Sequence, residues 1–370
     1  MGLSTLFYKK TVSTFCTAAH AFFSHFSVQL FSLLGFYAII SVLQRASGRA
    51  FPALLKGDEL LSLAVFWQPC ATGARALRVM GDSPCPVVPD IVAGLPVTEI
   101  GPYCFAARAS LPPTASLWPA GADASHPLCG DFLEQVTLPD SVTVLHSAAF
   151  YNCRRLTRLE AGPALRDLGS DLFTNCRALT TLALRAAPNA PTGLKKLVGA
   201  ISADVSAVFL SVPGAALHYP EYTEFLDENT PAHIFNHSIE GEGYRLRQCF
   251  TNAGSVDFAA YDAAFSQAQV AEPPAKLCRM ALARLCAPYT LAPQPRARYE
   301  TYLRTVPDAA FALVLAGRDT TALRLLCSLG LPTARAAAQF AEAGWSEGAA
   351  LLLSARHPAR RAPQYDFDDL

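Results

Sequence analysis

The stretch LEQVTLPDSVTVLHSAAFYNCRR at residues 133–155 decides the fold, because the chain repeats it in outline as LTRLEAGPALRDLGSDLFTNCRA at residues 156–178. Apolar residues, one phenylalanine and one Asn-Cys pair recur in both copies, always 23 residues apart. The columns are Leu133, Leu156 and Leu179; Val136, Leu159 and Leu182; Leu138, Ala161 and Leu184; Val142 and Leu165; Leu145 and Leu168; Phe150 and Phe173; Asn152 and Asn175; and Cys153 and Cys176. A fixed period of this length indicates stacked structural units.

Each copy contains a short strand of the form Leu-x-x-Val-x-Leu, whose apolar residues point one way while the intervening residues face outward. One copy cannot bury its apolar side alone, but neighbouring copies stacked as rungs form continuous apolar columns and a parallel ladder of backbone hydrogen bonds. We predict that Cys153 and Cys176 are small buried residues of such a column. The amides of Asn152 and Asn175 are expected to satisfy backbone groups of the turns.

A partial copy of the repeat lies upstream, in LPVTEIGPYCF at residues 95–105. The insert at residues 109–130, rich in Pro, Ala and Ser, separates it from the two clean copies and is expected to be an excursion loop. Further upstream, LLSLAVFW at residues 60–67 and ARALRVMG at residues 74–81 flank a turn that contains glycine. This pattern predicts a hairpin that caps the open end of the ladder, since an exposed strand edge invites aggregation.

The repeat resembles the bacterial BspA-like class of leucine-rich repeats, with its Leu-x-x-Ile/Val-x-Leu-Pro, Ile/Leu-Gly and Ala-Phe-x-x-Cys layout. The resemblance covers residues 87–185 and departs from the class in two ways. Only two and a half to three copies are recognisable, and Gly162-Pro163 replaces the expected Pro-Asp. The resemblance implies a curved solenoid that binds other macromolecules and carries no shared catalytic site.

Beyond Arg185 the 23-residue repeat is no longer recognisable. We predict one more strand within residues 201–212, ISADVSAVFLSV. Residues 218–250 are irregular and rich in aromatic residues, which favours packing at a junction, with a ligand groove as the alternative. The aromatic residues in question are Tyr219, Tyr222, Phe225, Phe235, Tyr244 and Phe250.

From Ala275 onward the apolar spacing predicts helices, with breaks at Pro288, Pro307, Gly317, Pro332 and Gly344. Several positions recur 27 residues apart, which favours paired helices in an α-solenoid. They are Gly317 and Gly344, Ala322 and Ala349, Leu325 and Leu352, and Leu326 and Leu353. The Ala and Leu positions and the Gly turn loosely resemble ankyrin repeats, although the Thr-Pro-Leu-His signature is absent.

The sequence therefore predicts an α+β repeat protein in which a short leucine-rich-repeat β-solenoid precedes an α-helical repeat region. We divide the chain into an apolar leader at residues 1–50 and a leucine-rich repeat domain with its capping hairpin at residues 58–215. An irregular, aromatic-rich junction follows at residues 216–274, then helical repeats at residues 275–355 and a frayed tail at residues 356–370.

The leader has no charged residue between Thr11 and Gln44, and its apolar part at residues 26–43 is long enough to cross a bilayer as a helix. Basic residues flank it on both sides, so its orientation is undecided, and no good cleavage site for a signal peptide follows. A membrane anchor is one interpretation, and a buried or dangling N-terminal helix is the other. We expect a cytoplasmic body, with membrane attachment through residues 26–43 as the open alternative.

The composition argues against only a few classes of function. Of the 370 residues, 30 are basic and 30 acidic, so the chain lacks the excess of positive charge that is typical of nucleic-acid-binding proteins. A hydrophobic fraction of 51% and a charged fraction of 16% make disorder unexpected for most of the chain. The 11 cysteines contain no Cys-x-x-Cys pair, so neither a disulfide framework nor a zinc module is indicated. No cofactor is expected.

His233 and His237 are four residues apart, which is the spacing of a metal-binding pair if the segment is helical. Pro231 and the nearby glycines argue against a long helix there, and a closed metal site needs about four ligands. No nucleophile elbow, phosphate loop or kinase motif occurs, and His146 is interpreted as a surface residue. We therefore predict that the protein is not an enzyme, with a metal-dependent hydrolase at this segment as the alternative.

The leading functional prediction is a non-catalytic scaffold that binds a protein partner. In the stacked arrangement Gln135, Arg158 and Thr181 form one outward column, and Thr137, Glu160 and Ala183 form the next. These side chains have no packing role and are therefore candidates for recognition. A membrane-tethered structural protein is the remaining alternative.

Overall fold

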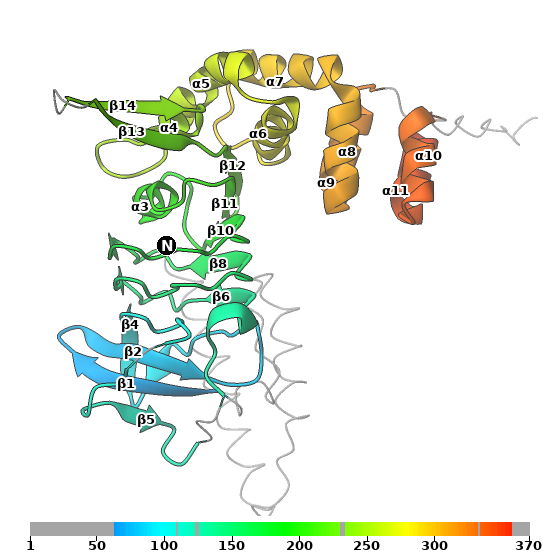
Figure 1. Ribbon diagram of the computed structural model, residues 1–370. Helices are drawn as coiled ribbons and strands as arrows, with labels where there is room; N and C mark the ends of the chain where they lie inside the picture. The colour runs from blue at the N-terminus through cyan, green and yellow to red at the C-terminus, as the bar shows by residue number, and fades with distance from the viewer. Residues whose placement is uncertain (1–62, 109, 123–125, 230–233, 332–333, 357–370) are drawn as a thin grey trace, which may run out of the picture. The chain divides into compact units, whose positions relative to one another are not determined.

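The computed structural model describes residues 63–108, 110–122, 126–229, 234–331 and 334–356 (Figure 1). Two ladders of short strands run along the repeat region. Sheet B is five-stranded, in the order β12-β11-β10-β8-β6. Its strands are β6 Gln135–Thr137, β8 Arg158–Ala161, β10 Thr181–Leu184, β11 Val205–Phe209 and β12 Ala215–Tyr219. They pair in parallel except for β12, which is antiparallel to β11.

Sheet A is seven-stranded, in the order β5-β1-β2-β4-β7-β9, with β3 paired to β4. Its strands are β1 Ala64–Cys70, β2 Gly73–Met80, β3 Ile91–Val92, β4 Leu95–Ile100, β5 Ser116–Trp118, β7 Val144–Leu145 and β9 Asp167–Leu168. Sheets A and B together form the β-solenoid predicted from the 23-residue period, and the short 3-10 helix η1, Gly130–Phe132, precedes β6.

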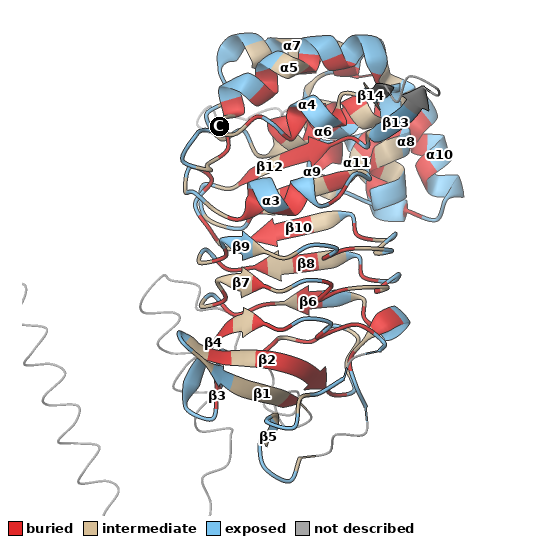
Figure 2. Ribbon diagram, turned by 60° about the vertical axis from the view of Figure 1, so that its left-hand side comes forward, coloured by how far each residue is buried: buried red, intermediate tan, exposed pale blue. Residues whose placement is uncertain are grey.

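The predicted register of the repeats is confirmed. Val136 lies beside Leu159, which lies beside Leu182. In sheet A, Leu145 lies between Ile100 and Leu168, so the partial upstream copy is a true rung. The rings of Phe105, Phe150 and Phe173 form a continuous stack, with centroids 5.0 and 5.8 Å apart. Red ribbon lines the interior of the solenoid in Figure 2, where these columns are buried.

The turns use their Asn-Cys pairs differently from the prediction. Asn152 and Asn175 have positive φ angles of 61° and 63°, a conformation that asparagine tolerates better than most residues. Their amides bond each other, Asn175 Nδ2 donating to Asn152 Oδ1 at 2.7 Å, instead of bonding turn backbone groups. Cys153 is fully buried as expected, whereas Cys176 is only half-buried.

The predicted hairpin is present as β1 and β2, which pair antiparallel across a turn at residues 71–72. The insert at residues 109–130 is not simply an excursion loop, as the sequence suggested. Its segment β5 pairs antiparallel with β1 and completes that edge of sheet A. The physical reason is that β1 alone would leave a row of backbone groups unpaired.

Helix α3, Leu194–Gly199, precedes β11 and β12 in the chain. The segment that follows, at residues 216–274, was expected to be irregular but contains regular elements. Strands β13, Thr223–Asn229, and β14, Ile234–Glu240, then form an antiparallel hairpin, followed by the short helix α4, Gly243–Leu246. Of the aromatic residues, Tyr219 is fully buried, whereas Phe225 and Tyr244 are exposed, so core packing holds for only part of the set.

Helix α5, Phe258–Ala271, was not predicted, although Phe258, Tyr261, Phe265 and Ala268 are buried at helical spacing and Asp257 caps its first turn. The remaining helices follow the predicted segments and breaks. They are α6 Pro274–Cys286, α7 Pro293–Thr305, α8 Pro307–Gly317, α9 Thr320–Ser328, α10 Ala334–Glu342 and α11 Ser346–Arg356. The 27-residue period is only partly reflected in burial. Ala322 and Ala349 are both buried, whereas Leu326 is fully buried and its equivalent Leu353 is 50% exposed.

None of the helices in the described residues is long and apolar enough to cross a membrane. The leader at residues 1–50, including the proposed span at residues 26–43, and the tail from residue 357 lie outside the described residues.

Candidate functional site

Sheet B brings the five predicted recognition residues together on its outer face. The strand register places Gln135 beside Arg158 and Arg158 beside Thr181. In the next column Thr137 lies beside Glu160. Gln135 is exposed and the other four are half-buried, so all five side chains reach solvent. Ala183, predicted to end the second column, is instead buried and contributes no exposed side chain.

A charge network that the sequence did not reveal fixes the centre of this face. Glu160 accepts hydrogen bonds from Arg158 at 3.2 Å and from Arg185 at 2.7 Å. Arg185 also donates to Asp140 Oδ1 at 2.8 Å and to the carbonyl of Leu138. Half-burial would lower the pKa of Arg185, but its bonds to Glu160 and Asp140 outweigh this and raise it. The two arginines are therefore held in defined positions.

Arg185 was missed because it stands just after the last clear strand of the repeat, where the periodic pattern ends. Its position relative to the strands nevertheless accounts for its contacts. Arg185 directly follows β10, and the parallel register places it beside Glu160 of β8 and Asp140, which follows β6. Glu160, Arg158 and Arg185 together form the charged centre of the candidate site.

At one end of the sheet the outer column is covered. Ser206 follows Thr181 and His218 follows Ser206 in the same column. His218 is 1% exposed and its Nδ1 lies 3.0 Å from Ser206 Oγ. Burial, together with the positive charges of Arg279, Arg247 and Lys276, lowers its pKa to about 3, so the ring is neutral. The open face therefore runs from β6 to β11.

A second charged cluster lies on sheet A. Glu99 Oε2 is 2.6 Å from Arg75 Nε and 2.7 Å from His146 Nε2. Partial burial opposes ionisation of Glu99, but the hydrogen bonds from His146 and Arg75 lower its pKa. His146 is only half-exposed and holds a neighbouring rung, so its role is structural.

The proposed metal pair does not have the predicted helical geometry. His237 lies in strand β14, where its Nε2 is 3.3 Å from Glu224 Oε2 on β13, and both side chains are about half-exposed. His233 lies outside the described residues. Residues 223–229 and 234–240 pair as antiparallel strands, so His237 does not lie on the helix that the His spacing required. Within the described ranges, no group of three or more His, Cys, Asp or Glu side chains is placed to hold a metal ion.

Comparison with known proteins agrees with the geometry of the ladder. Residues 128–190 match the sequence model of the BspA type leucine rich repeat region (6 copies). No curated protein is significantly similar in sequence. Among solved structures, the chain is similar to a leucine rich cell surface protein from Faecalibacterium prausnitzii and to the T. pallidum leucine rich repeat protein.

The first of these structures is 20% identical, with a TM-score of 0.23 over 38% of this chain and 34% of that one, so this chain spans about a third of its length. The second is 19% identical, with a TM-score of 0.20 over 37% of this chain and 72% of that one. The match at residues 128–190 falls on the 23-residue ladder of stacked rungs, so this segment is similar to leucine-rich repeats in its sequence and has the rung register expected of them.

Proposed function

We propose that the protein is a non-catalytic scaffold that binds a protein partner through the outer face of sheet B. The observation that carries this proposal is the set of half-exposed polar side chains held in register on three adjacent strands: Gln135, Thr137, Arg158, Glu160 and Thr181. Side chains with little packing role on a rigid scaffold are well suited to recognition.

The chemistry of the face suggests a polar partner surface. Glu160 uses both carboxylate oxygens on arginines, and all three guanidinium nitrogens of Arg185 already donate hydrogen bonds. Arg158 donates only through Nη2 among the described residues, so it is the cation offered to a carboxylate of the partner. Because Glu160 already orients Arg158, this side chain loses less conformational entropy when a partner binds than a loose side chain would. Toward β11 the second column passes from the buried Ala183 to the half-buried Val208, which is the apolar side chain that a partner could contact there.

The test is to compare binding by the full chain and by the double variant Arg158→Ala, Glu160→Ala. Partners captured from a cell extract by the wild-type chain are measured individually for affinity. The matched control is Arg166→Ala, Asp167→Ala, which removes one cation and one anion at exposed positions beside and on β9 of sheet A. Selective loss of binding by the first variant supports the proposal. Equal binding by both folded variants removes this face from consideration.

Two finer parts of the proposal concern organisation and location. Helices α8 and α10 begin 27 residues apart, at Pro307 and Ala334, and Arg335 pairs with Asp308 across the same interval. This supports treating α8–α9 and α10–α11 as two copies of an ankyrin-like helical pair. The ten cysteines in the described part of the chain are free thiols, which is compatible with a cytoplasmic body. Fractionation of cells expressing the full chain tests the location.

A further inference from the structure

The last rung of the repeat ladder has no further rung stacked on its turn. Within the ladder, turn N–H groups of one rung donate to carbonyls of the next: Ala148 to Ser170 at 2.9 Å, Phe150 to Leu172 at 3.2 Å and Asn152 to Thr174 at 2.9 Å. The equivalent groups of the following rung, 23 residues further on, are the N–H groups of Asp171, Phe173 and Asn175. Among the residues that the structure describes, these three N–H groups have no hydrogen-bond partner.

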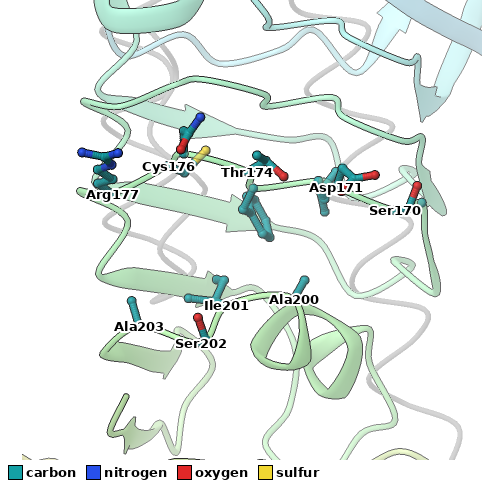
Figure 3. Close-up of a pocket in the computed structure, with 13 residues that line it drawn as sticks. Ser170, Asp171, Thr174, Cys176, Arg177, Ala200, Ile201, Ser202 and Ala203 are labelled. Atoms are coloured by element: carbon teal, nitrogen blue, oxygen red, sulfur yellow. The ribbon is translucent and has the colours of Figure 1, made fainter. Parts of the chain in front are cut away.

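No further turn of this kind stacks on the rung, because the chain forms α3 after the repeat register ends. Instead, the turn at residues 169–177 faces the segment at residues 200–203 across a groove of about 620 Å³ (Figure 3). This volume lies within the range of roughly 300–1,000 Å³ found for ligand sites. The stack of phenylalanine rings ends at Phe173, which lines the groove together with Ile201.

The far wall of the groove is rigidly held. The buried side chain of Arg247 donates to the carbonyls of Val198 and Ile201, each at 3.0 Å, and to the carbonyl of Ala203 at 2.7 Å. The carbonyl of Ser202 accepts from Tyr222 N at 3.0 Å. The carbonyls of Ile201, Ser202 and Ala203 are occupied in this way, so they are held in place and do not accept from the three N–H groups opposite them. The groove is therefore formed before any ligand binds.

We propose that this groove binds a peptide segment of a partner protein, which takes up the turn conformation of residues 170–175 and adds to the ladder as one more rung. N–H groups at every second residue require a row of acceptors at the same spacing, and the carbonyls of a peptide backbone supply it. Within the chain itself, the carbonyls of Ser170, Leu172 and Thr174 do this for the preceding rung. The exposed charges Asp171 and Arg177 are of opposite sign and do not select an anion.

Side chains add selectivity to the backbone contacts. An apolar side chain of the peptide would lie on Phe173, continuing the stack in which ring centroids are 5.0–5.8 Å apart. Asn175 donates Nδ2 to Asn152, so its Oδ1 remains an acceptor for an amide N–H of the incoming segment. The preferred segment therefore has an apolar residue followed two positions later by Asn or Gln. This site is separate from the outer face of sheet B, so the two proposals fail independently.

The probe is a synthetic peptide with the sequence of residues 165–178, LRDLGSDLFTNCRA, since this segment already occupies such an edge within the chain. Amide hydrogen exchange is measured on the full chain with and without the peptide. In the free chain we expect fast exchange at the three open amides and slow exchange at the paired amides of Ala148, Phe150 and Asn152. The peptide should slow the open amides, and a scrambled peptide should not.

The variant Ser202→Trp fills the groove from its exposed wall, and Ser328→Trp at an exposed position of α9 is the matched control. We expect the first to bind the peptide at least about tenfold more weakly, or about 1.4 kcal/mol, and the second to bind like wild type. Unchanged exchange at the Ala148 rung verifies that the variant is folded, and the scrambled peptide tests specificity without any variant.

Three results would overturn the proposal. One is slow exchange of the open amides in the free chain, and another is equal binding of the peptide by wild type and Ser202→Trp. The third is protection that rises with protein concentration in the absence of peptide and accompanies a dimer, because the occupant would then be a second copy of the chain.

Discussion

Single residues in this protein are constrained mainly by how closely the rungs approach one another. Gly169 occupies the position that His146 has in the preceding rung. A Cβ atom at Gly169 would lie 2.3 Å from the backbone nitrogen of Ser147, too close for any side chain. The same applies to Gly162, whose Cβ would lie 2.3 Å from Asp140 Cα, and this explains why glycine replaces the Pro expected in the repeat at that position.

We therefore predict that Gly169→Ala destabilises the protein by about 1–3 kcal/mol, because the clash is with backbone that cannot move freely. Chemical denaturation measures the free energy of unfolding. The control is Gly199→Ala at the end of α3, where a Cβ would meet nothing within 4 Å. If the two variants were equally stable, the close approach of rungs at Gly169 would be wrong.

His218 links stability to pH. Its pKa is lowered from 6.5 to about 3 in the folded protein, first by burial and then by nearby cations. Between these values the unfolded chain binds the proton and the folded chain does not, so stability is complete above pH 6.5 and falls as the pH drops toward 3. Each pKa unit corresponds to about 1.4 kcal/mol.

The variant His218→Gln should flatten this dependence while keeping a polar group near Ser206. The free energy of unfolding measured between pH 7 and about pH 4 tests this. His237→Gln, at an exposed histidine, is the control and should retain the wild-type slope. A slope that survives in the first variant would assign the acid sensitivity to other groups.

At the scale of elements, the helices are joined by buried polar contacts as well as by apolar packing. Asp262 of α5 receives two hydrogen bonds from Arg284 of α6, at 2.7 and 2.8 Å, and one from the hydroxyl of Tyr299 of α7 at 2.8 Å. Arg284 is completely buried, and its guanidinium lies 4.9 Å from the ring centre of Phe258. One carboxylate thus connects three helices.

Removing that carboxylate should be costly, because it leaves the Arg284 charge buried without a partner. We expect Asp262→Asn to lower the free energy of unfolding by about 3–5 kcal/mol. The exposed pair of Asp308 and Arg335 provides the control, and Asp308→Asn should have no measurable effect. A small loss in Asp262→Asn would mean that apolar packing alone holds the three helices.

At the scale of the whole described body, the helical region completes the solenoid. Strand β12 is the edge of sheet B, and α6 packs against it. The hydroxyl of Tyr261 on α5 accepts a hydrogen bond from His218 N at 3.0 Å and donates one to His218 O. A side chain of the helical region thus satisfies backbone groups of an edge strand that would otherwise be unpaired.

Tyr261→Phe should therefore destabilise the protein by about 1–3 kcal/mol, since it leaves two buried backbone groups unsatisfied. Hydrogen exchange at His218 should become faster in the same variant. Tyr302→Phe is the control, because the Tyr302 hydroxyl has no hydrogen-bond partner among the described residues. Unchanged exchange at β12 in Tyr261→Phe would show that the helices do not protect this edge.

Much of the architecture could be predicted from the sequence because its signals are local and repeated. The 23-residue period places Leu159 beside Val136 and Leu182 whatever the surroundings, since apolar columns have to align to be buried. Helices α6 to α11 follow from apolar spacing and from Pro and Gly breaks. The strand register also predicts which positions point outward, and the five recognition candidates do reach solvent, whereas Ala183, predicted outward by the same register, is buried.

The remaining features depend on contacts between residues far apart in the chain. Arg185 reaching Asp140 and Glu160, β5 pairing with β1, and Tyr261 bonding His218 leave no periodic signal in the sequence. The amino-acid sequence alone therefore determined the stacked rungs and the helices, because hydrophobic periodicity is a property of residues that are close together in the sequence. Only the tertiary structure decided which edges are covered and which N–H groups stay open, because a backbone hydrogen bond depends on what the fold brings opposite it.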